Sequence, residues 1–116
     1  MLVIRHEQMK VLGDAMQRQF ELRTLERLHR NFPKQLENRM DEELLTMIRR
    51  GISQAAGYGI VSQIDVTRYI EYMILYGPDF DSQLTRVGEI LRTPGLQSAE
   101  KMDRIDDYDQ FARNRE

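Results

Sequence analysis

The chain has 116 residues, of which 31% are charged and 41% are apolar, an ordinary balance for one globular domain with a buried core. Seventeen basic and nineteen acidic side chains give a formal net charge of −2, so charge provides no general attraction to nucleic acid or anionic lipid. The absence of cysteine excludes disulfides and thiolate metal sites. The first apolar run is too short for a signal peptide and no later run reaches membrane-spanning length, so we expect a cytoplasmic protein.

Apolar residues recur at three- to five-residue steps over the first third of the chain, which predicts one long helix with a single buried stripe. The stripe consists of Met9, Leu12, Met16, Phe20, Leu25, Leu28 and Phe32. Pro33 is expected to end this helix, because the residue before a proline is pushed out of the α conformation. The basic side of the helix, which includes Arg23 and Arg27, is a natural docking surface for a partner helix or strand.

A second helix is predicted from Asp41, a suitable N-cap residue, to the two glycines that end it, Gly57 and Gly59. Gly51 inside this helix costs about 1 kcal/mol relative to alanine. We therefore expect a close approach to a neighbouring helix, with residues 55–56, both alanine, extending the strip of small side chains.

The densest apolar run of the chain follows and predicts a third helix. Ser62 is placed to cap it, and Asp65 three residues later would complete a capping box, in which each side chain takes a free backbone N–H. Between residues 69 and 76 only one residue is charged, so apolar side chains point around the whole helix. Such a helix is buried on more than one side, and we expect it to form the centre of the fold.

A fourth helix is predicted after a break at Gly77 and Pro78, with Asp79 or Asp81 as its cap and the phenyl ring between them turned inward. The same residues could begin a calcium-binding loop. However, the EF-hand pattern requires glycine where Leu84 stands, so helix capping is the better interpretation.

A turn at residues 93–95 separates the fourth helix from the last one, which Ser98 is expected to cap. The charged tail, about residues 110–116, is expected to fray. Five helices with short connections therefore predict an all-α fold: a compact bundle around the central apolar helix, in a single domain over residues 1–116.

The sequence predicts no enzyme, no metal site and no cofactor. Glu26 and His29 form one E-x-x-H pair, but a di-iron bundle needs two such pairs, and the only other histidine, His6, has no partner at the matching position. There is no P-loop, G-x-G-x-x-G or G-x-S-x-G motif. We therefore expect the protein to act through its surface.

Tyrosine and arginine are favoured at protein interfaces, and tyrosines gather in and beside the most apolar segment. Each tyrosine could equally be a core residue whose hydroxyl is bonded inside the protein. The predicted partner-binding residues are Tyr58, Tyr69, Tyr72, Tyr76, Arg23 and Arg27.

Several stretches, taken together and in order, resemble a known family. They are IRHEQM at residues 4–9, RNFP at 30–33, IRRGISQAAGYGIVSQIDVTRYI at 48–70, YGPDFD at 76–81, EIL at 89–91 and SAEKMDRI at 98–105. The chain is similar to small bacterial proteins encoded beside type VI secretion spike, PAAR and effector genes, and the order and spacing of the stretches carry the resemblance. The linker, residues 34–40, and the tail after Asp106 depart from the family pattern.

This resemblance implies a cytoplasmic accessory of effector loading. Such a protein would be an adaptor or co-chaperone that binds an effector, its PAAR partner or another chaperone, and it needs no catalytic residue. The two departures from the pattern leave the choice of partner open.

Two other functions and self-association stay open. An immunity protein would block a cognate effector, usually through a strongly charged or plugging surface, which the near-neutral composition does not favour. A nucleic-acid-binding helix-turn-helix is mimicked by the second helix, the Gly57–Gly59 turn and the central helix. The would-be recognition helix, however, begins with one arginine against two acidic residues. The first helix could also mediate homo-oligomer formation.

Overall fold

The computed structural model describes residues 14–114, which form six α-helices and contain no strand. The helices are α2 (Asp14–Asn31), α3 (Asp41–Gly57), α4 (Gln63–Tyr76), α5 (Phe80–Gln83), α6 (Thr85–Leu91) and α7 (Ser98–Asn114). The predicted all-α fold is confirmed. The predicted start of the first helix, with Met9 and Leu12, lies outside the described residues.

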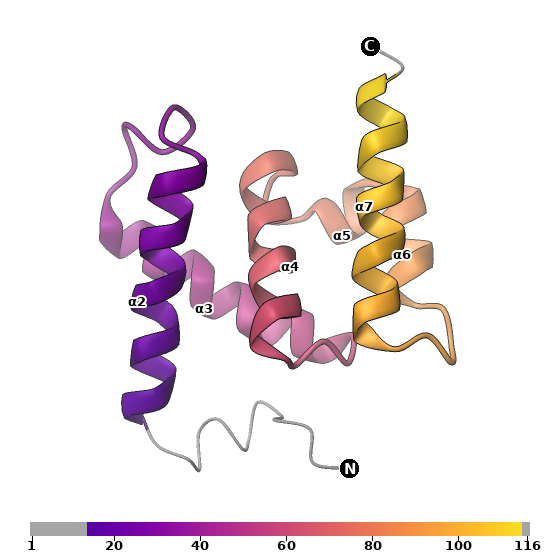
Figure 1. Ribbon diagram of the computed structural model, residues 1–116, viewed down its shortest axis with the longest axis horizontal. Helices are drawn as coiled ribbons and strands as arrows, with labels where there is room; N and C mark the ends of the chain where they lie inside the picture. Colours follow the sequence, from indigo (N-terminus) through magenta and orange to yellow (C-terminus); the bar gives the residue numbers. More distant parts are fainter. Residues whose placement is uncertain (1–13, 115–116) are drawn as a thin grey trace.

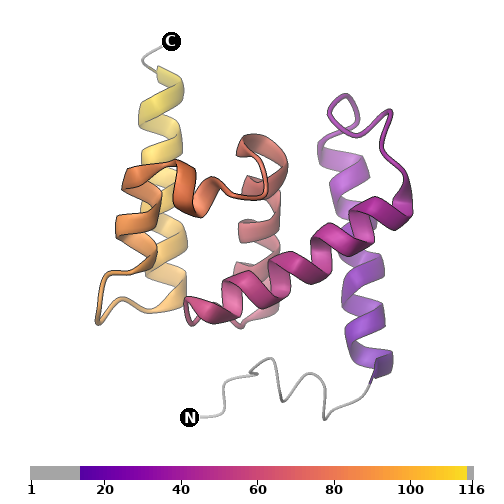
Figure 2. The same ribbon diagram turned by 180° about the vertical axis from the view of Figure 1, so that it is seen from behind.

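The six helices lie in two layers. In one layer α2, α4 and α7 stand side by side and run in the same direction (Figure 1). The other layer holds α3, which crosses behind α2 and α4, and the short helices α5 and α6 (Figure 2). The molecule measures 43 × 39 × 19 Å, so it is a slab about two helices thick. Within residues 14–114, no helix combines the length and the apolar character that crossing a membrane requires.

The predicted central helix is α4, which contacts α2, α3, α5 and α7. Its side chains Tyr69, Ile70 and Met73 are at most 1% exposed. They join one hydrophobic cluster to which all six described helices contribute. The helix is therefore buried on several sides, as its apolar composition predicts.

Gly51 marks the point where α3 and α4 pack most tightly. A Cβ atom at this position would lie 2.6 Å from Cγ1 of Ile70 and 2.9 Å from Sδ of Met73. The close approach predicted from this glycine is confirmed, and Ala55 on the same side of α3 is fully buried.

The predicted cap of α4 is confirmed, and the predicted cap of α3 is wrong. The Ser62 hydroxyl accepts a hydrogen bond from the backbone N–H of Asp65 (3.3 Å), which caps α4. The Asp65 carboxylate, expected at a backbone N–H, instead accepts from the Ser62 hydroxyl (2.8 Å). The N-cap of α3 is Met40, without a side-chain cap, because Asp41 already lies in the helix and is hydrogen-bonded to His29 (2.8 Å).

The region predicted as one fourth helix is two. The backbone of Leu84 is extended and separates α5 from α6. Asp79 stands at the N-cap of α5, but its carboxylate pairs with Arg50 instead of capping the helix. Phe80 is fully buried, as predicted.

At the start of α7, the Ser98 hydroxyl donates to Asp65 instead of capping its own helix. The last helix, α7, ends at Asn114, and fraying of the tail from about residue 110 stays a prediction.

The apolar stripe predicted for the first helix is only partly buried. Phe20, Leu25 and Leu28 belong to the core cluster, and Phe32 packs against it. Met16 is 41% exposed, because the part of α2 that the core covers begins at Phe20.

Candidate partner-binding surface

The structure places two of the four candidate tyrosines in the core. Tyr69 is fully buried, its ring lies 4.9 Å from that of Phe80, and its hydroxyl accepts a hydrogen bond from Gln54 (2.7 Å). Tyr72 is 7% exposed and its ring also lies near Phe80. Burial raises the pKa of both phenols. Neither side chain offers area to a partner, so we assign both to the core.

The other two tyrosines are half-buried, and their hydroxyls bond within the protein. The Tyr58 hydroxyl donates to Asp81 (2.6 Å), and burial together with this carboxylate raises the pKa of Tyr58. The Tyr76 hydroxyl donates to Asp109, and burial together with that carboxylate raises the pKa of Tyr76 to about 12. All four hydroxyls therefore bond within the protein, while the partner-binding role of the half-buried Tyr58 and Tyr76 stays a prediction.

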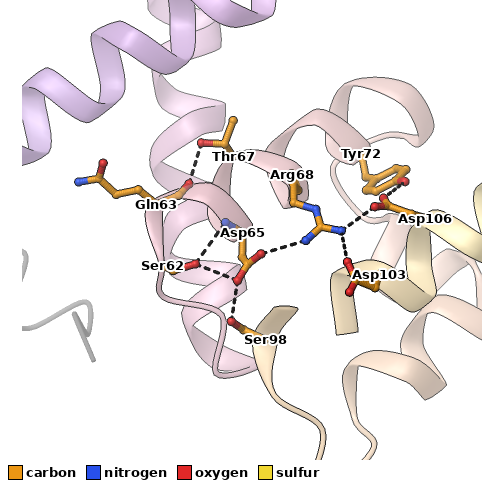
Figure 3. A network of polar contacts seen from close by, with 9 residues as sticks. All are labelled: Ser62, Gln63, Asp65, Thr67, Arg68, Tyr72, Ser98, Asp103 and Asp106. Atoms are coloured by element: carbon orange, nitrogen blue, oxygen red, sulfur yellow. Dashed lines mark hydrogen bonds and ion pairs between the residues drawn. The ribbon is translucent and has the colours of Figure 1, made fainter. Parts of the chain in front are cut away.

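Tyr72 and Tyr76 belong to a polar contact between α4 and α7, which we call the α4–α7 seam. Its members are Ser62, Asp65, Arg68, Tyr72, Tyr76, Ser98, Asp103, Asp106, Asp109 and Arg113. Figure 3 shows the part of the seam from Ser62 to Tyr72 on α4 and from Ser98 to Asp106 on α7, where side chains of the two helices point toward one another.

Arg68 is the centre of the seam. Its guanidinium donates to Asp65 on its own helix (3.1 Å) and to Asp103 (2.8 Å) and Asp106 (2.6 Å) on α7 (Figure 3). The buried Asp65 carboxylate, 6% exposed, also accepts from the hydroxyl of Ser98 at the start of α7 (2.8 Å). A planar guanidinium suits this role, because its donors can serve several carboxylates at once.

The seam is built for adhesion between helices. Among the described residues, every buried side-chain nitrogen or oxygen has a hydrogen-bond partner. Over the same part of the chain, no group of three or more histidine, aspartate or glutamate side chains could hold a metal ion. Each carboxylate we name in the seam is matched by a donor, and these contacts explain how α7 is held to α4.

The exposed candidate site lies on the other side of α4, in a groove between α2 and α4 with a volume of about 230 Å³. We call it the α2–α4 groove. Phe20 and Thr24 line it from α2, and Ile64 and Thr67 line it from α4. Ile64 is 76% exposed, a large value for an isoleucine inside a helix.

The groove brings together the two arginines that the sequence singles out. Arg23 donates to the side-chain oxygen of Gln63 (3.0 Å), and Arg27 donates to Glu71 (3.1 Å). Both arginines are exposed, and they share the lining of the groove with Arg68. The rim is therefore basic on the side of α2.

Ile64 is the residue that reasoning from sequence missed. It lies near the start of the predicted third helix, before the apolar stretch of residues 69–76, and was given no role. Its spacing nevertheless carried a signal, because Ile64 shares a helix face with Thr67, Arg68 and Glu71, at steps of three, four and seven residues. An apolar residue on a polar face points away from the core.

No protein-family model, curated protein or solved structure matches the chain.

Proposed function

We propose that this chain is a non-enzymatic protein-binding accessory of a bacterial type VI secretion module. It acts in the cytoplasm as an adaptor or co-chaperone during loading of an effector or its PAAR or spike protein. The link to type VI secretion rests on the resemblance of the ordered stretches, among them residues 48–70 and 98–105. The binding role is supported by the α2–α4 groove.

The observation that carries the proposal is an exposed apolar side chain within a basic rim. Ile64 stands in the groove beside the buried ring of Phe20 and would lose most of its contact with water when covered. Interfaces combine such an apolar centre with a polar, charged periphery.

The charges of the rim indicate the chemistry of the partner. Arg23 bonds to a neutral amide, and among the described residues no carboxylate lies within ion-pair distance of it. The side chain of Arg27 is 52% exposed even though it pairs with Glu71. We infer that the groove receives an amphipathic helix of the partner, with an apolar residue on Ile64 and acidic residues on the two arginines.

Affinity purification from the native host tests this function. A tagged chain is expected to co-purify with the product of a neighbouring effector, PAAR or chaperone gene, identified by mass spectrometry. The variants Ile64→Asp and Arg23→Glu are expected to lose that product, because one puts a charge in the apolar centre and the other reverses the rim. Glu89→Lys, an exposed charge reversal on α6, is the matched control and keeps it.

An effector activity assay separates the remaining possibilities. An adaptor or co-chaperone leaves the activity of the bound effector intact, whereas an immunity protein abolishes it. Retention on DNA that falls steeply with salt would indicate a nucleic-acid-binding protein. If no product of a neighbouring gene is recovered with the wild-type chain, the proposed function is wrong.

A further inference from the structure

We propose that two copies of this chain pair face to face through the layer of α2, α4 and α7, about a twofold axis that runs along α4. We call this layer the broad face. The pairing does not depend on the proposed function, and it is tested on the purified protein alone.

The shape of the molecule supplies the area. A slab only 19 Å thick presents a face of 43 × 39 Å. A stable dimer buries roughly 800 Å² per partner. The broad face is larger than that, so pairing over part of it is sufficient.

The charges on the broad face are arranged in a self-complementary way. The edge of α2 that faces α4 carries Arg23 and Arg27, and the edge of α7 that faces α4 carries Asp103 and Asp106. The two helices flank α4 on opposite sides (Figure 1). A half-turn about α4 therefore places the basic edge of one copy over the acidic edge of the other.

The charged residues of the two edges also lie at similar heights, that is, at similar positions along the axis of α4. On one side of α4, Arg23 bonds to Gln63 and Arg27 bonds to Glu71. On the other side Asp103 and Asp106 bond to Arg68, which lies between those two positions. Because the proposed axis is parallel to α4, a half-turn about it leaves these positions along α4 unchanged (Figure 1).

Both edges keep charge available for a second copy. The side chain of Asp103 is 70% exposed and that of Asp106 is 47% exposed, although both contact Arg68. Arg23 makes its bond to a neutral amide. Ile64, 76% exposed on α4, lies near the proposed axis and would meet its own counterpart, which gives the interface an apolar centre.

The two charged edges favour a second copy over an unrelated partner as the occupant of the broad face. An acidic partner would need only the α2 edge, whereas the twofold also satisfies the α7 edge in the same contact. Since the broad face includes the α2–α4 groove, the second copy must leave when a partner helix occupies the groove.

Reciprocal charge reversal is the test, read out as mass by sedimentation velocity across a wide concentration range. The wild-type chain is expected to form dimers. Arg23→Glu and Asp103→Lys each replace two attractive contacts by two repulsive ones, so each variant alone is expected to dimerise at least tenfold more weakly. Mixed in equal amounts, the two variants are expected to form a heterodimer. The new side chain at position 23 of one variant then faces the new side chain of opposite charge at position 103 of the other. Asp103 of the first variant still faces Arg23 of the second.

Two further variants keep the result independent of folding. Ile64→Asp is expected to abolish pairing, while its circular dichroism and melting stay unchanged, because the side chain is exposed and an acidic residue suits the first turn of a helix. Glu89→Lys, on α6 in the other layer, is expected to dimerise like the wild type. A wild type that stays monomeric throughout, or a mixture that fails to pair, would overturn the proposal.

Discussion

At the scale of single residues, Gly51 decides how closely α3 and α4 can approach. The side chains of Ile70 and Met73 occupy the space that a Cβ atom would need. A glycine inside a helix is unfavourable by about 1 kcal/mol relative to alanine, and the contact it permits between α3 and α4 offsets that cost.

The substitution Gly51→Ala tests this balance. Overpacking costs about 1–3 kcal/mol and helix propensity returns about 1 kcal/mol, so we expect a net loss of unfolding free energy of up to about 2 kcal/mol. Gly57→Ala is the matched control, because apart from its own stretch of helix no atom lies within 4 Å of its Cβ position. Urea unfolding measures both variants, and a Gly51→Ala variant more stable than Gly57→Ala would contradict the packing described.

Asp65 shows how one side chain can serve two helices. Its backbone N–H is bound by the Ser62 hydroxyl, while its carboxylate accepts from Ser98 and Arg68. A residue expected to stabilise only the start of α4 therefore also fixes the start of α7. Its 6% exposure is tolerated because these donors compensate the lost hydration of the carboxylate.

At the scale of elements, α7 is held to α4 by polar groups as well as by apolar ones. Met102 and Ile105 are buried, and the seam runs beside them. The phenols of Tyr72 and Tyr76 must be protonated to donate to Asp106 and Asp109. Their raised pKa values express that requirement, with burial as the largest cause.

This requirement predicts a loss of stability in alkaline solution. A phenol whose pKa rises from 10.0 to about 12 on folding, as for Tyr76, keeps its full contribution below pH 10. The contribution is lost as the pH rises from 10 toward 12, by at most about 1.4 kcal/mol per pH unit for each phenol. Melting temperatures across this range measure the loss.

Tyr76→Phe is the control for the alkaline experiment. It removes one ionising phenol and is expected to make the decline with pH shallower, although the variant is less stable at neutral pH because Asp109 loses a donor. Equal slopes for the variant and the wild type would show that Tyr76 does not contribute.

At the scale of the whole molecule, one cluster joins all six described helices, with α4 in contact with four of the others. Because the described helices share this one core, we expect them to unfold together. The flatness of the molecule leaves two broad faces in place of a compact sphere, which is why a surface-based function and pairing of copies both suit this shape.

We expect a single cooperative unfolding transition. Loss of helix, followed by far-ultraviolet circular dichroism, should coincide with loss of the tyrosine environment, followed by fluorescence. The tyrosine signal reports α4 in particular, because Tyr69 and Tyr72 lie in the core. Two separated transitions would show that α2 or α7 detaches before the rest.

Local chemistry was sufficient to predict α2, α3, α4 and α7 and some of their ends, whereas α5 and α6 were predicted as one helix. Ser62 lies three residues before the backbone N–H that it caps, and the apolar residues of α4 are neighbours in the sequence. Such features depend on spacing along the chain, which determines them before the helices meet.

Tertiary structure alone decided which side chains face a neighbour and which remain exposed. Tyr72 and Asp106 are 34 residues apart in sequence, so no local pattern shows that the tyrosine belongs to the core. The same holds for two predicted helix caps: Asp41 bonds to His29 instead, and Asp79 pairs with Arg50. A polar side chain takes the donor or acceptor that packing brings nearest, and a helix face is buried only where another helix covers it.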